Sequence, residues 1–178
     1  AFAGIEVTPV TQHHAAVVAA DPPAPRTGAP LEPAAVLDRL HRNAIHHDLH
    51  LLAAVQSGRV IMLVGETDDA SRDAALLSEG LGPGPIVVGP TVPHLFAAGR
   101  SARAAISGHA AAAAWPGAPR PASAAELLAE RALIGDLPAR NGLVSRIVRP
   151  LQHSPGGNLL ATATAYLEEG RSLQAAAR

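Results

Sequence analysis

The chain contains no cysteine and few aromatic residues. The absence of cysteine excludes disulfide bonds, thiolate zinc sites and cysteine nucleophiles. Aromatic residues make up 2% of the 178 residues, so no stacking platform for single-stranded nucleic acid is available. No apolar run is long enough to cross a membrane, and residues 1–10 lack the basic start and apolar centre of a signal peptide. We therefore expect a cytoplasmic protein that does not contact a membrane.

Lysine is also absent, so all 14 basic residues are arginine. Together with the abundance of alanine, glycine and proline, this bias is typical of a high-GC genome. The charge is nonetheless divided unevenly along the chain. Residues 1–99 hold five arginines against ten carboxylates, whereas residues 100–178 hold nine arginines against five carboxylates. The second half is therefore the part that we expect to face an anion such as a phosphate.

Apolar runs and turn residues divide the first part of the chain into alternating strands and helices. Short apolar runs predict four strands, at residues 13–20, 51–55, 59–64 and 85–88. Helices are predicted over residues 31–49, 68–81 and 93–114. Asp68 and Asp69 favour the start of the second helix, and Gln56-Ser57-Gly58 favours a tight hairpin between the second and third strands.

The predicted order is β-α-β-β-α-β followed by a further helix, which is that of the ferredoxin-like fold. We therefore predict an α+β protein with a ferredoxin-like domain at residues 1–117. The remainder, residues 118–178, has no strong strand pattern and is predicted to be all-helical. Its helices are expected after Ser123, from Pro138 or Asn141 to Val148, and over residues 158–168. Gly170-Arg171-Ser172 ends the last of them, and Ser172 begins another helix inside which the chain stops.

The strand-to-helix turn at residues 89–93 is the strongest candidate for an anion site. Backbone N–H groups at a helix start attract anions, and Arg100 and Arg103 would add charge and bidentate hydrogen bonds. The candidate ligand-binding residues are therefore Gly89, Thr91, Arg100 and Arg103. The alternative, an ordinary turn followed by two exposed arginines, is the simpler interpretation and stays open.

Other candidate sites lack residues that their chemistry needs. His46 and His50 are spaced i, i+4 and could face one metal ion, but no further ligand accompanies them, and a solvent-facing polar stripe explains them equally well. No serine lies in a GxSxG motif, and the chain has neither GxxxxGK[ST] nor a GxGxxG that follows a strand. We expect neither enzymatic activity nor a bound metal.

Three segments resemble the PucR/CdaR family of bacterial transcription regulators. They are residues 89–93, 101–106 and 126–136, and the resemblance continues over residues 159–178. In that family the helix-turn-helix opens at this point, and its recognition helix follows the present C-terminus. The resemblance implies double-stranded DNA as a partner of the full-length protein, and a homodimer or higher homo-oligomer. It places Arg171, Ser172, Gln174 and Arg178 at the start of the DNA-binding region.

Family members have a central module similar to the GGDEF fold of nucleotide cyclases. The hairpin that carries the acidic signature in cyclases reads Val-Gln-Ser-Gly-Arg-Val at residues 55–60, with no carboxylate to bind a metal. The resemblance therefore implies a degenerate GGDEF-like module that senses a ligand or forms dimers without catalysis. Two alternatives stay open: a nucleotide- or ligand-binding domain descended from a cyclase, and a pure oligomerisation scaffold.

The segment 115–121, Trp-Pro-Gly-Ala-Pro-Arg-Pro, resembles a branch of the family that controls mycolic-acid and fatty-acid synthase genes in actinobacteria. This resemblance implies long-chain acyl-CoA as an effector and no bound cofactor. Arg100 and Arg103 are the residues that we would expect to bind its phosphate groups.

Overall fold

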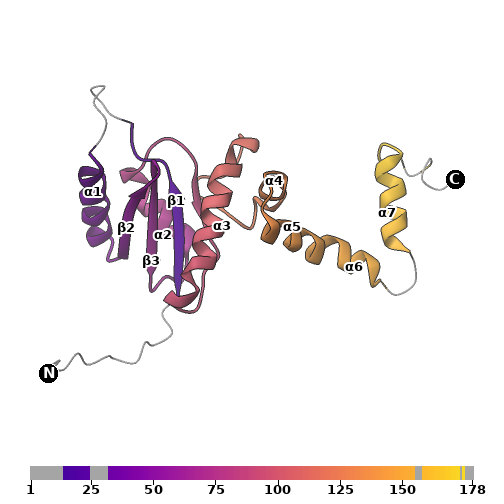
Figure 1. Ribbon diagram of the computed structural model, residues 1–178, viewed down its shortest axis with the longest axis horizontal. Coiled ribbons are helices and arrows are strands. Elements are labelled where there is room, and N and C mark those ends of the chain that lie inside the picture. The colour runs from indigo at the N-terminus through magenta and orange to yellow at the C-terminus, as the bar shows by residue number, and fades with distance from the viewer. Residues whose placement is uncertain (1–13, 25–31, 155–157, 173, 175–178) are drawn as a thin grey trace.

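The computed structural model describes residues 14–24, 32–154, 158–172 and 174 of the chain. Its centre is a five-stranded sheet with the order β2-β3-β1-β4-β5 (Figure 1). The strands are β1 (Ala15–Ala20), β2 (His50–Gln56), β3 (Arg59–Gly65), β4 (Ile86–Val88) and β5 (Ala122–Ser123). β3 runs antiparallel to both β2 and β1, and β1 runs antiparallel to β4. The first four strands therefore have the order and directions of the ferredoxin-like fold, which confirms the predicted fold class.

β1 occupies a central place because it is apolar throughout and pairs with a strand on each side. All six of its residues are buried, as is typical of a strand that is covered on both faces. β2 and β3 form the predicted hairpin through Ser57 and Gly58, whose φ values are 51° and 75°. Both values lie in the left-handed region that suits a two-residue hairpin loop.

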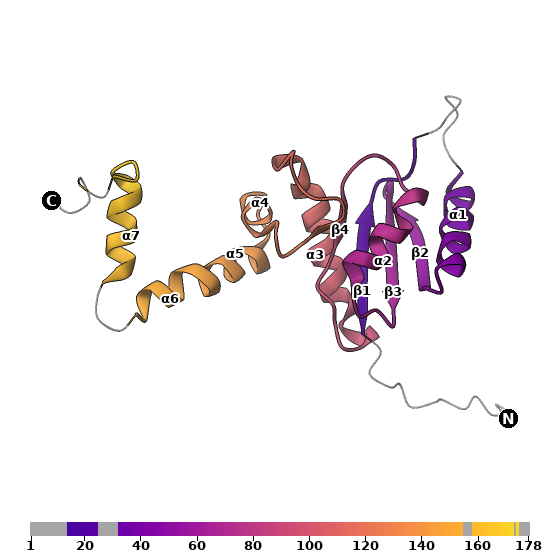
Figure 2. The same cartoon turned by 180° about the vertical axis from the view of Figure 1, so that it is seen from behind.

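Two helices cover one face of the sheet. They are α1 (Pro33–His46) and α2 (Ala70–Leu77), which is followed by the 3₁₀ turn η1 (Ser78–Gly80). Figure 2 shows α2 lying across the strands on this side. α2 begins at the predicted cap, because the Asp69 carboxylate accepts hydrogen bonds from the backbone N–H groups of Ser71 and Arg72. The largest core cluster forms here, where Leu40 and Leu77 pack with Met62.

The opposite face is covered by α3 (Ala98–Ala111), which lies between the 3₁₀ turns η2 (Leu95–Ala97) and η3 (Ala112–Ala114) (Figure 1). Ala105 packs against Val17 and Ala19 of β1. The buried Ser101 hydroxyl accepts a hydrogen bond of 2.8 Å from the Val17 N–H. The sheet is therefore the middle layer of three, and α3 is fixed to it by a polar contact as well as by packing.

The fifth strand was not predicted. β5 has only two residues, and it pairs in parallel with β4 after the chain has passed along α3. The sheet therefore extends past residue 117, where the first domain was predicted to end. The division of the chain into two domains is otherwise untested and stays a prediction.

A series of helices leads away from the sheet after β5. They are α4 (Leu128–Leu133), α5 (Leu137–Leu143), the π-helix η4 (Val144–Val148), α6 (Arg149–Gln152) and α7 (Leu159–Glu168). α5, η4 and α6 follow one another without a break, and α7 stands at their far end (Figures 1 and 2). We call the segment from Leu137 to Glu168 the arm. No helix within the described ranges is long and apolar enough to cross a membrane.

Candidate ligand-binding site

The main candidate site is a pocket of about 880 Å³ between α3 and the helices that follow β5. This volume lies in the range of small-molecule sites. One wall comes from α3, and the other comes from α4, α5 and η4. The lining residues are Pro90, Arg100, Arg103, Ala104, Ser107, Ala125, Leu128, Arg131, Ile134, Gly135, Asp136, Pro138, Gly142 and Arg146. The pocket is therefore formed jointly by α3 of the sheet domain and by the helices that follow β5.

Three arginines contribute positive charge to this pocket. Arg100 and Arg103 lie three residues apart on α3 and so share one helix face, and Arg146 approaches from η4. Arg100, Arg103 and Arg146 are exposed, and none of them has an ion-pair partner among the described residues. Unpaired guanidinium groups around an apolar pocket favour a ligand with an anionic group.

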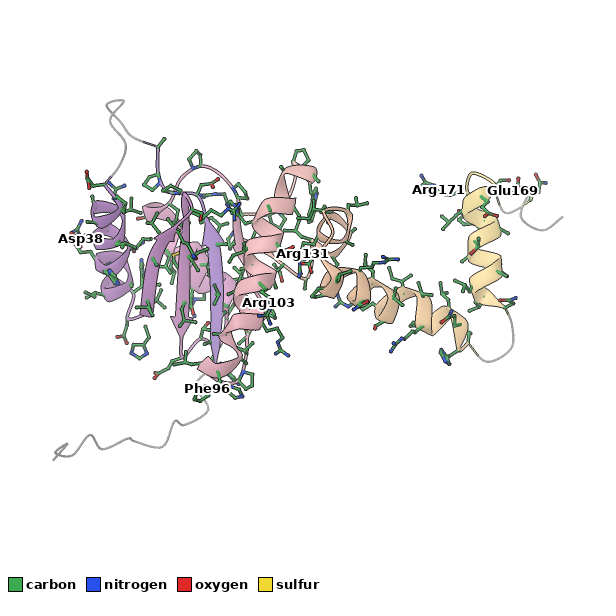
Figure 3. All side chains as sticks on the ribbon, viewed as in Figure 1. Asp38, Phe96, Arg103, Arg131, Glu169 and Arg171 are labelled. Carbon is green, nitrogen blue, oxygen red and sulfur yellow. The ribbon has the colours of Figure 1, made fainter. Side chains whose placement is uncertain are left out.

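A buried ion pair joins α4 to α5 beside the pocket. The Arg131 guanidinium donates from Nε and Nη2 to Oδ2 of Asp136, at 3.0 and 2.8 Å. Its Nη1 atom donates to the Ala124 carbonyl oxygen at 2.7 Å. Both side chains are almost wholly buried, so this pair fixes the turn after α4. Figure 3 shows Arg131 near α3 and α4, on the same side of the molecule as Arg103.

Asp136 remains charged at neutral pH despite its burial. Burial raises the pKa of this carboxyl, but hydrogen bonds from Ser107, Arg131 and the Ala139 N–H, together with the charge of Arg131, lower the pKa overall. The Ala139 N–H lies 3.3 Å from Oδ1, so Asp136 also caps α5. The charged carboxylate therefore serves the structure, and it is not a free acid facing the pocket.

The structure brings together only part of the predicted anion site. Arg100 and Arg103 line the pocket as expected, but Gly89 and Thr91 do not. The Gly89 N–H donates to the Val17 carbonyl oxygen at 2.8 Å, so it has no free N–H to offer an anion. Thr91 is exposed. Pro90 between them does line the pocket, because the turn passes its rim.

The sequence prediction missed Arg146 and the apolar wall formed by Leu128 and Ile134. The sequence gives little indication of these residues, because they belong to the later helical segment. The position of that segment relative to α3 cannot be predicted from the pattern of neighbouring residues. A partial clue is the spacing of Arg100, Arg103 and Ser107, which puts all three on one face of a predicted helix.

Of the residues expected at the start of the DNA-binding region, Arg171, Ser172 and Gln174 follow the end of α7. Gly170 has a φ of 63°, and the Arg171 N–H donates to the Tyr166 carbonyl oxygen at 2.8 Å, which ends the helix as a Schellman-type cap. Arg171, Ser172 and Gln174 are exposed, and Arg171 lies far from Arg103 and Arg131 (Figure 3). Arg178 lies outside the described residues. Their proposed contact with DNA stays a prediction.

The histidines considered as metal ligands have other neighbours. The His46 ring packs edge-on against His47, with 4.9 Å between the ring centroids. His50 Nδ1 lies 3.1 Å from the Glu66 carboxylate. The described part of the chain contains no group of three or more residues that could hold a metal ion.

Comparison with known proteins identifies relatives of this chain and a solved structure with the same fold. Uncharacterised proteins of Mycobacterium tuberculosis and Mycobacterium bovis are 43% identical to the chain over 140 residues, which is 78% of this chain and 32% of theirs. The chain thus spans about a third of the length of these curated relatives. A crystal structure of a regulator of polyketide synthase expression from Bifidobacterium adolescentis shares the fold, with a TM-score of 0.70, 21% identity, and coverage of 92% of this chain and 67% of that one. Residues 8–111, more than half of the chain, match the family model of the GGDEF-like domain, and the chain therefore belongs to the family of GGDEF-like domains.

Proposed function

We propose that the chain is the non-catalytic regulatory segment of a cytoplasmic transcription regulator of the PucR/CdaR type. The observation that carries the proposal is the extent of the structural likeness to a regulator of polyketide synthase expression. That likeness covers 92% of the chain, which is more than residues 1–117 alone could supply. The two proteins therefore share part of the helical segment as well as the sheet, and we propose that this segment connects the sensing module to the DNA-binding region.

The hairpin between β2 and β3 supports a role without catalysis. Its turn is formed by Ser57 and Gly58, and Arg59 is the only charged residue in the stretch 55–60. Nucleotide chemistry at this hairpin would need carboxylates to bind a metal ion. A test is magnesium-dependent GTP turnover by the purified chain. Robust turnover that is lost in Asp68→Asn or Asp69→Asn would overturn the proposal.

We propose long-chain acyl-CoA as the effector and the pocket between α3 and α5 as its site. The apolar side chains of Leu128 and Ile134 suit an acyl chain, and Arg100, Arg103 and Arg146 suit phosphate groups. Thermal shift with palmitoyl-CoA against free CoA tests this proposal. A larger shift with palmitoyl-CoA that Arg103→Gln reduces is the expected result. Equal or absent shifts would remove this effector.

The proposed output is control of fatty-acid or mycolic-acid synthesis genes through DNA. In the intact protein, a recognition helix after α7 would enter the major groove, and Arg171, Ser172, Gln174 and Arg178 would lie at its approach. DNA binding by the full-length protein and by this chain is compared at fixed salt on the protein's own promoter. Salt-sensitive, sequence-selective binding by the long form alone is expected, whereas no binding by either form would end the transcription proposal.

A further inference from the structure

A second pocket, of about 630 Å³, lies where β1 ends, β3 begins and α3 ends. It shares no lining residue with the pocket between α3 and α5. The side chains of Asp21, Arg59, His109, Trp115 and Arg120 all line it. None of these residues has a role in the function proposed above, so their convergence needs its own explanation.

His109 is the buried polar group of this pocket. Its side chain is 8% exposed, and its Nε2 atom lies 3.2 Å from Oδ1 of Asp21. This contact is poorly aligned, so the buried Nε2 has no well-aligned hydrogen-bond partner among the described residues. A buried polar atom without a partner is costly. A ligand in the pocket would supply that partner.

The protonation of His109 follows from its surroundings. Burial lowers the pKa of His109, the charge of Asp21 and its contact with the ring oppose this effect, and the charge of Arg59 lowers the pKa further. The imidazole is therefore neutral at pH 7. With His109 neutral, the pocket carries two arginines against the single carboxylate of Asp21, which leaves an excess of positive charge.

The pocket is built in advance by specific backbone contacts. Arg120 donates from Nε to the Gly84 carbonyl oxygen at 2.9 Å and from Nη2 to the Gly82 carbonyl oxygen. A Cβ atom at Gly84 would lie 2.0 Å from Oδ2 of Asp21, so a larger residue at this position would displace that carboxylate. The loop and the charged groups are thus held in place before any ligand binds, which lowers the entropic cost of binding.

Trp115 adds an aromatic surface. It is the only tryptophan of the chain, and it is half-buried beside the pocket, where it packs on the cluster around Leu127. An indole next to guanidinium groups favours a flat ring that carries negative charge, because the ring stacks and the charge pairs.

We propose that this pocket is a second ligand site, which binds a planar aromatic anion. The ring would lie against Trp115, the carboxylate or phosphate would pair with Arg59 and the free side of the Arg120 guanidinium, and a polar atom of the ligand would bond to Nε2 of His109. This site goes beyond the proposed regulatory function and does not depend on it, because it shares no residue with the acyl-CoA pocket or with α7.

The fluorescence of Trp115 tests the proposal directly, since no other tryptophan contributes. AMP and benzoate are the probes, which represent an aromatic phosphate and an aromatic carboxylate. Saturable quenching by at least one of them is expected, and whichever binds identifies the source of the anion. Adenosine and inorganic phosphate, which each lack one half of the required chemistry, are expected to bind at least tenfold more weakly.

Two variants locate the site. Arg59→Gln removes a half-exposed charge that has no ion-pair partner among the described residues, and it is expected to weaken binding at least tenfold. Arg103→Gln, the matched change in the other pocket, is expected to leave binding unchanged. Absence of quenching by both probes, equal binding of adenosine or phosphate, or unchanged binding in Arg59→Gln would each overturn the proposal. None of these outcomes bears on DNA binding by the full-length protein.

Discussion

Arg131 is the buried charge that fixes the join between α4 and α5. Its guanidinium pairs with Asp136 and bonds to the Ala124 carbonyl oxygen. Arg131→Met keeps much of the side-chain volume but leaves both acceptors with fewer partners. We expect the free energy of unfolding to fall by about 3 kcal/mol, the usual cost of removing one member of a buried ion pair.

Urea unfolding followed by circular dichroism measures this loss. The matched control is Arg140→Met, because Arg140 is exposed on α5 and forms no ion pair with another described residue. A change below about 0.5 kcal/mol is expected there. Equal effects of the two substitutions would show that the pair with Asp136 does not stabilise the join.

His109 gives the stability of the chain a dependence on pH near neutrality. Burial lowers the pKa of His109 in the folded state, with Asp21 opposing and Arg59 assisting, whereas the unfolded state protonates near pH 6.5. The unfolded state therefore binds the proton first as the pH falls. The stability contributed by neutral His109 is complete above about pH 6.5 and is lost as the pH falls toward the folded pKa.

The measurement compares wild type with His109→Gln by denaturant unfolding between pH 7.5 and pH 5. Both proteins carry the other eight histidines, so the difference between their two pH profiles isolates His109. Wild type is expected to lose more stability than the variant as the pH falls. Parallel profiles would mean that His109 titrates alike in the folded and unfolded states.

Among the secondary elements, α3 packs closely against a glycine of the turn that follows β4. A Cβ at Gly89 would lie 2.2 Å from the carbonyl oxygen of Ser101, and backbone cannot move aside as a side chain can. Gly89→Ala is expected to push α3 from β1 and β4 and to lower the free energy of unfolding by about 1–3 kcal/mol.

Gly99→Ala, in α3 itself, is the matched control. A Cβ at Gly99 meets only the end of the Arg103 side chain, at 3.7 Å. Since alanine favours helix over glycine, this change is expected to stabilise the chain by up to about 1 kcal/mol. Thermal unfolding of both variants measures the two changes in stability. A loss of stability in Gly99→Ala comparable to that in Gly89→Ala would contradict the steric explanation.

The elements that the sequence predicts well are those with a local signal. The apolar run of β1, the Ser57-Gly58 turn and the Asp69 cap each identify their structure from a few adjacent residues. β5 has no such signal, because a two-residue strand exists only through its parallel pairing with β4. Arg146 escaped prediction for a similar reason, since its place in the pocket depends on how the helices after β5 are arranged relative to α3.

At the scale of the whole molecule, most of the arm does not pack against the rest of the described chain. It leads away from the sheet (Figures 1 and 2), and no residue of η4, α6 or α7 is buried. Several large apolar side chains on it are exposed, namely Leu137, Val144, Ile147, Leu159 and Leu167. Exposed apolar side chains gathered in one region indicate a surface that another protein covers.

The family resemblance implies a homodimer or higher homo-oligomer, and we propose that a second copy of the chain covers the arm in that assembly. Ile147 is 53% exposed near the middle of the arm, and Ile147→Glu would place a charge in such an interface. We expect the wild-type chain to be a dimer at micromolar concentration by light scattering, and the dissociation constant of the Ile147→Glu dimer to be at least tenfold higher.

Ile45→Glu is the matched control, because Ile45 is 79% exposed on α1, away from the arm. The dissociation constant of the Ile45→Glu dimer should match that of wild type. A wild-type monomer, or an Ile147→Glu dimer as tight as that of Ile45→Glu, would show that the arm is not the dimer interface.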